Sequence, residues 1–110
     1  MSRTFRPEYM DQIRCWEIAR EQVRKLLPEC ESKATSILLI SIMLTAGKLA
    51  GLSRAERNQY EINTKECHEK LLKERQNEQA MELLSKGYRV KVRFFATAPK
   101  LYLWCYHFRF

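Results

Sequence analysis

The stretch SILLISIMLTAGKLAGLS, residues 36–53, is the most apolar part of this 110-residue chain. No charged side chain occurs from Ala34 to Gly47, and only Lys48 interrupts the apolar segment before Leu52. A membrane-spanning helix needs about 20 predominantly apolar residues, so this segment is only just long enough. Its internal Ser and Thr residues, and the lack of Trp or Tyr at its edges, favour a buried core helix. A membrane span over residues 34–52 remains the alternative.

Length and composition fit one compact domain. Apolar residues make up 45% of the chain and charged residues 30%, with only three Gly and three Pro. This balance is typical of a folded, helix-rich protein rather than a disordered one. A chain of this length can bury one modest core but not two. We therefore predict a single domain over residues 1–110.

Three helices are predicted: the first and third from apolar side chains at helical spacing, the second from its apolar run, and all three from boundary signals. Pro7 suits the first turn of a helix, and Pro28 ends that helix. Gly51 suits the end of the second helix, and the spacing of Ser53 and Glu56 is that of a capping box at the start of the third. The predicted helices cover about residues 7–27, 33–50 and 53–86.

The corner AGKLAGLSRAERNQY, residues 46–60, partly fits the outline of a helix-turn-helix unit. Gly51 falls at the turn and Ser53 opens the second helix, as such units require. Arg57 falls where the second helix should point an apolar side chain inward. The match is partial, and many ordinary helix–Gly–helix corners would share it.

The last 23 residues, YRVKVRFFATAPKLYLWCYHFRF, alternate with period two on both sides of TAPK. They are rich in Val, Tyr, Phe and Trp, which are common in strands, and contain Pro only at the break. We therefore predict a β-hairpin with strands at about 88–96 and 101–109. The predicted fold class is α+β, mainly α, with three helices, the third long, followed by this C-terminal hairpin.

The positive charge is concentrated at the C-terminal end. The formal net charge is +7, and the first 86 residues carry nearly balanced charges. From Gly87 onward there are five cations and no acid, so this segment supplies most of the excess. One end of the molecule is therefore strongly cationic.

One face of the predicted hairpin would place cations beside aromatic rings. This combination suits nucleic acid, because rings stack on bases while Lys and Arg contact phosphates. Packing of the rings on the helices, and a protein or lipid-headgroup partner, are the alternatives. The candidate nucleic-acid-binding residues are Arg89, Lys91, Arg93, Lys100, Tyr102, Trp104 and Tyr106.

Catalytic and metal-binding signals are weak. Cys67 and His68 are neighbours on a predicted helix, where adjacent side chains diverge, and Cys105 and His107 lack further ligands. We therefore expect no enzyme activity, no metal and no cofactor. The four cysteines have irregular spacing, and no secretory leader precedes them, which favours free thiols in a reducing intracellular compartment.

These patterns lead to a small, basic, non-enzymatic nucleic-acid-binding protein, in which the hairpin could act like the wing of a winged helix. The alternative is an accessory or inhibitor subunit that docks on a larger protein complex, with residues 34–52 as a single membrane pass. A protein partner or a homo-oligomer is expected in either case, because the long charged third helix exceeds what one 110-residue chain can cover.

Overall fold

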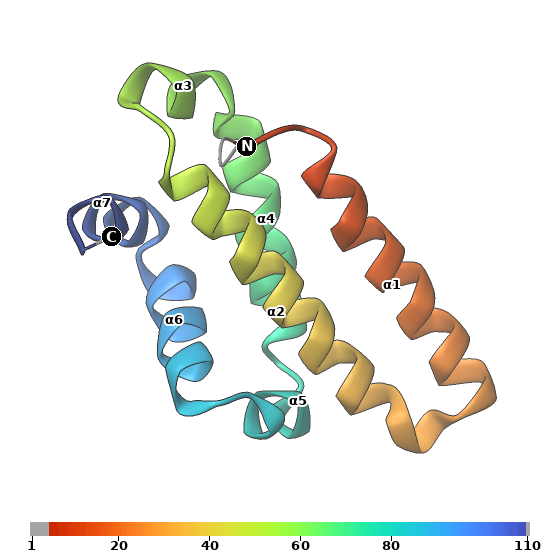
Figure 1. Cartoon of the computed structure of the whole chain (residues 1–110). Helices are drawn as coiled ribbons and strands as arrows, with labels where there is room; N and C mark the ends of the chain where they lie inside the picture. The colour runs from red at the N-terminus through yellow and green to blue at the C-terminus, as the bar shows by residue number, and fades with distance from the viewer. Residues whose placement is uncertain (1–4, 110) are drawn as a thin grey trace.

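The computed structural model describes the backbone of residues 5–109, and their side chains except those of 54 and 106–109. This part of the chain contains α-helices and one short 3-10 helix, and no β-strand (Figure 1). The elements, in chain order, are α1 (Tyr9–Leu26), η1 (Pro28–Cys30), α2 (Glu31–Ala50), α3 (Arg54–Gln59), α4 (Glu61–Glu74), α5 (Glu78–Leu83), α6 (Lys86–Thr97) and α7 (Pro99–Arg109).

Helix α2 is the centre of the fold. It packs against α1, α4, α5, α6 and α7, and Leu38, Leu39 and Ile42 have no exposed surface. The hydroxyl of Thr45 donates to the Ser41 carbonyl at 3.0 Å, so polar side chains inside the apolar stretch can be satisfied within the helix. Burial of its apolar side chains against five other helices contributes to the stability of the domain.

The segment Pro28–Ala50 is long and apolar enough to cross a membrane by length and composition. Within this segment, 67% of the most apolar stretch of 18 residues is buried inside the protein. A core helix of a soluble protein meets the same two criteria, so length and composition do not separate the two roles.

Helix α1 runs alongside α2 and contributes Met10 and Ile13 to the core, together with Phe5 from the segment before it. At the far end of α2, Lys48 lies over the ring of Tyr9 with its Nζ 5.7 Å from the ring centroid. The observed limits of α1 and α2 lie close to the predicted helices at 7–27 and 33–50.

The predicted long helix at 53–86 is three helices, α3, α4 and α5. The capping box that opens it is confirmed: the Ser53 hydroxyl accepts from the Glu56 N–H, and the Glu56 carboxylate accepts from the Ser53 N–H. The predicted helix is interrupted because a further N-cap lies within it. Asn77 starts a new helix by accepting a hydrogen bond from the Ala80 N–H at 3.0 Å. Helix α3 has only six residues, too short for the recognition helix of the partial helix-turn-helix pattern.

The predicted β-hairpin is wrong, and the α+β fold class is wrong with it: the described chain is all-α. Residues 88–96 lie in α6, which begins after Ser85, whose hydroxyl accepts from the Tyr88 N–H at 3.3 Å. Residues 101–109 lie in α7, in which Pro99 is the first residue rather than part of a hairpin turn. Val92, Phe95 and Ala96 are the buried side chains of α6, at helical spacing.

Candidate nucleic-acid interface

Helix α6 forms one edge of the molecule, on the opposite side of α2 from α1 (Figure 1). Its inner face is fixed to two neighbouring helices. The Nε2 atom of His68, from α4, lies 2.9 Å from the carbonyl oxygen of Ala96, and the Phe95 ring packs edge-on against Tyr102 of α7 with centroids 5.4 Å apart. These contacts hold α6 in one orientation, so its outer face is a defined surface.

The outer face of α6 has an ordered distribution of side chains. On a helical wheel with about 100° per residue, its exposed side chains cover an arc of roughly 160°. Lys86 and Arg93 lie toward one edge of this arc, Lys91 lies at the other, and the positions between them are uncharged. The uncharged positions include Gly87 and Val90. We call this arc the α6 outer face; its members are Lys86, Gly87, Val90, Lys91, Arg93, Phe94 and Thr97.

The cations of α6 have no anionic partner within the described residues, where every ion pair lies elsewhere. Lys91 lies over the Tyr88 ring at 5.6 Å, and Arg89 is half-buried with its Nε atom lacking a hydrogen-bond partner. The charge of this segment is therefore not neutralised by the fold itself. It remains available to an external anion.

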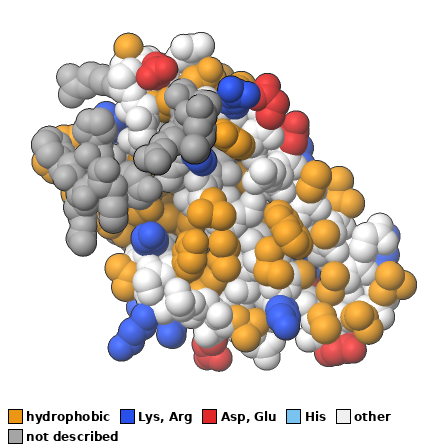
Figure 2. Space-filling view, viewed as in Figure 1, with side chains coloured by type: hydrophobic (Ala, Val, Ile, Leu, Met, Phe, Trp, Pro, Cys, Tyr) orange, Lys and Arg blue, Asp and Glu red, His pale blue; other side chains and the backbone are white. Residues whose placement is uncertain are grey.

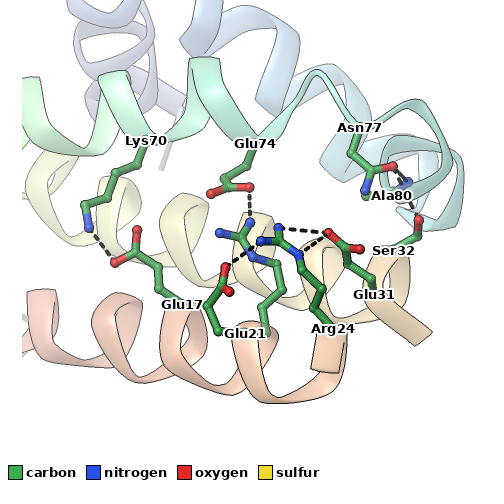
Figure 3. Close-up of polar contacts among 10 residues, drawn as sticks. Glu17, Glu21, Arg24, Glu31, Ser32, Lys70, Glu74, Asn77 and Ala80 are labelled. Atoms are coloured by element: carbon green, nitrogen blue, oxygen red, sulfur yellow. Dashed lines mark hydrogen bonds and ion pairs between the residues drawn. The ribbon is translucent and has the colours of Figure 1, made fainter. Parts of the chain in front are cut away.

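The opposite side of the molecule shows the contrast, because there the charges are paired (Figure 3). Lys70 of α4 contacts Glu17 of α1 at 2.7 Å, and Arg24 contacts Glu21 at 2.8 Å and Glu31 at 2.9 Å. The cations that join α1 to its neighbours are thus balanced by nearby carboxylates, whereas α6 and α7 contain no acidic residue.

Helix α7 carries the remaining candidate residues, and the structure separates them. Lys100 and Trp104 are exposed and lie one turn apart, which places them on the same side of the helix. Tyr102 is buried and contacts Phe94 and Phe95, so it is a packing residue and is not available to stack on a base. The side chain of Tyr106 lies outside the described residues.

The structure therefore brings Arg89, Lys91 and Arg93 onto one helix and Lys100 and Trp104 onto the next, and it removes Tyr102 from the set. Sequence reasoning missed Lys86 and Gly87, because both were assigned to the end of the third helix. The signal that could have found them is Ser85, an N-cap residue placed just before cations spaced by three and four.

The described residues contain no group of three or more His, Cys, Asp or Glu side chains that could hold a metal ion. All four cysteines are free, and Cys67 is fully buried with its sulfur 3.9 Å from the sulfur of Met10. Burial raises the pKa of the Cys67 thiol to about 12, so this group is a protonated packing residue at neutral pH.

A second surface is apolar. Hydrophobic side chains gather over α2 and α1 in Figure 2. On α2, Ile37 and Leu44 are exposed and Ile40 is partly buried, at the spacing of one helical stripe. Trp16 of α1 is 39% exposed. We call this the α1–α2 apolar face.

Comparison with known proteins gives no relative: no family model, no curated protein and no solved structure matches this chain.

Proposed function

We propose that this protein is a non-enzymatic nucleic-acid-binding protein whose contact surface is the α6 outer face, with Lys100 and Trp104 of α7 beside it. One observation carries the proposal: Lys86, Lys91 and Arg93 are exposed on one face of a single helix, and neither α6 nor α7 contains an acidic residue to balance them. Phosphates are anions at regular spacing along a chain, and cations on a rigid helix can neutralise several of them together.

The exposed ring of Trp104 adds a second type of contact. On an unpaired base, stacking on an aromatic ring contributes roughly 1–3 kcal/mol and depends little on salt, because stacking is uncharged. Phosphate contacts by Lys91 and Arg93 depend strongly on salt, because binding releases counterions. The two kinds of contact can therefore be separated by experiment.

The test compares the wild type with a Lys86→Ala, Lys91→Ala, Arg93→Ala variant. Affinity for a labelled nucleic acid is measured by fluorescence anisotropy across a salt series. At roughly 0.7–0.9 per phosphate contact, the slope of log affinity against log salt should flatten by about two to three units. Arg89 is left intact because it is half-buried and its loss could disturb the fold.

A matched control removes the same charge elsewhere. Lys65, Lys73 and Arg75 are exposed on α4 and at its C-cap, so a triple alanine variant there changes the net charge equally. The slope of this control should stay near that of the wild type. Equal flattening in both variants would show a nonspecific effect of net charge and would contradict the proposed surface.

The α1–α2 apolar face supports a second candidate function, that of an accessory subunit docking on a larger protein. The observation that favours it is the exposure of Leu44 (57%) and Trp16 on adjacent helices. Replacing Ile37 and Leu44 by Gln should abolish cross-linking to such a partner and should leave nucleic-acid affinity unchanged. Cross-linking that survives both substitutions would place the partner's site elsewhere.

A further inference from the structure

We infer that the nucleic acid bound by the α6 outer face is double-stranded DNA, and that α6 lies in its major groove with its two cationic edges against the two phosphate backbones. This inference rests on the proposed function and names the class of nucleic acid. It follows from the arrangement of charge across α6, from the shape of its centre, and from the burial of Tyr102.

The first argument is the separation of the cations. Arg93 and Lys86 occupy one edge of the exposed arc and Lys91 the other, with uncharged positions between them. The major groove of B-form DNA is about 12 Å wide, and an α-helix with its side chains is about 10–12 Å across. A helix lying in this groove therefore faces phosphates on both flanks and base edges at its centre. The charge pattern of α6 matches that environment.

The second argument is the profile of the centre. Gly87 lies in the first turn of α6, and a Cβ atom added there would meet nothing within 4 Å. The absence of a side chain at this exposed position lets the start of the helix approach its target closely, and the first residues of a recognition helix are those that usually reach base edges. Val90 is 64% exposed and can contact thymine methyl groups.

The third argument disfavours three other targets. A platform for single strands needs several exposed rings, and among the described side chains of α7 the ring of Trp104 is exposed while that of Tyr102 is packed against α6. A helix that inserts into lipid needs a broad apolar face, and that of α6 (Val92, Phe95 and Ala96) is buried in the core. Double-stranded RNA is disfavoured because its major groove is too deep and narrow for side chains to read.

The test uses a substitution that changes shape but not charge, Gly87→Leu. A Cβ atom at this exposed position meets nothing within 4 Å, and leucine is a better helix former than glycine, so the unfolding temperature should not fall. Affinity for duplex DNA should fall by about tenfold or more, because the added side chain keeps the helix from seating in the groove. Affinity for a single strand of the same length, which has no groove, should fall much less than affinity for the duplex. Gln22→Leu, on the exposed surface of α1, is the matched control and should affect neither.

The outcomes separate this inference from the proposed function. Unchanged duplex affinity in Gly87→Leu, or wild-type binding to a single strand that equals or exceeds binding to the duplex, would overturn the groove model and leave nucleic-acid binding in place. Absence of salt-dependent binding to both probes would overturn the proposed function itself. In that case, binding of the wild type to phosphatidylserine-containing vesicles, but not to phosphatidylcholine vesicles, would assign the cations to a lipid surface.

Discussion

Arg20 of α1 and Glu74 of α4 form a buried ion pair, with side chains that are 8% and 6% exposed (Figure 3). The same two helices are joined by the ion pairs of Lys70 with Glu17 and Arg14 with Glu66, and by the packing of Cys67 against Met10. The Nε of Arg20 and one oxygen of Glu74 have no hydrogen-bond partner in the described structure. Charged contacts therefore link α1 to α4.

Breaking this pair on one side should be strongly destabilising. Arg20→Met leaves the Glu74 carboxylate buried without a partner, so the free energy of unfolding should fall by roughly 3–5 kcal/mol. Arg20→Met combined with Glu74→Leu should recover much of the loss, because no buried charge remains. Urea unfolding of both single variants and the double variant measures the coupling.

The exposed pair of Arg24 and Glu21 provides the comparison. Glu21→Ala should change stability by less than about 1 kcal/mol, because solvent screens this pair. A double variant no more stable than the single Arg20→Met variant would show that the buried pair is not the source of the effect.

The buried thiol of Cys67 predicts a stability loss at alkaline pH. Its pKa is raised from 9.0 to about 12 by burial in the native state. Between these values the unfolded chain releases this proton and the native protein keeps it. Stability therefore falls as pH rises above 9 and levels off near 12, by at most about 1.4 kcal/mol for each pH unit.

Cys67→Ala should remove this component of the pH dependence, at a separate and pH-independent cost in lost packing. Denaturant unfolding at a series of alkaline pH values, wild type against variant, isolates it. Thiol labelling gives an independent check: exposed Cys15 should react with a thiol reagent at once, and Cys67 only after unfolding. Equal labelling rates for the two thiols would contradict the burial of Cys67.

The N-cap of α6 is expected to support both the fold and the binding surface. Ser85→Ala removes the acceptor for the Tyr88 N–H and should lower stability by about 1 kcal/mol. Amide hydrogen exchange in the first turn of α6 should become faster, while exchange in α2 changes little. Ser85→Asn keeps a side-chain acceptor and should preserve protection; if it exchanges as fast as Ser85→Ala, the cap is not the cause.

The central position of α2 leads to a prediction about handling. Because most of the apolar surface of α2 is covered by other helices, the purified protein should stay in solution without detergent. Ultracentrifugation after carbonate treatment of cell extracts checks this. Recovery in the membrane pellet, with release only by detergent, would favour the membrane-spanning alternative for residues 34–52.

The sequence was informative where a single periodicity applied. The first helix has three- and four-residue apolar spacing and a Pro after its end, and its predicted limits lie close to those of α1. The capping box at Ser53 and Glu56 was also readable, because both hydrogen bonds of the box are local. Local signals of this kind do not depend on what packs around them.

The C-terminal segment could not be read in this way because it satisfies two periods. Val90, Val92 and Phe94 alternate as in a strand, while Tyr88, Val92 and Phe95 have helical spacing. Strand propensity depends strongly on packing context, and here burial against α2, α4 and α7 favours the helix. The predicted hairpin also placed Tyr102 on an exposed strand face, whereas in α7 this side chain packs against α6. The positive charge of the segment did not depend on this choice, since it follows from composition alone.

The central claim, that the α6 outer face binds nucleic acid, is tested most directly by the salt dependence of wild-type affinity. Fluorescence anisotropy with a labelled DNA duplex should show log affinity falling linearly with log salt concentration, with a slope near −3 if Lys86, Lys91 and Arg93 each neutralise a phosphate at about 0.9 per contact. If the wild type does not bind the duplex at low salt, or binds it with an affinity that does not change with salt, the α6 outer face does not bind nucleic acid through its cations.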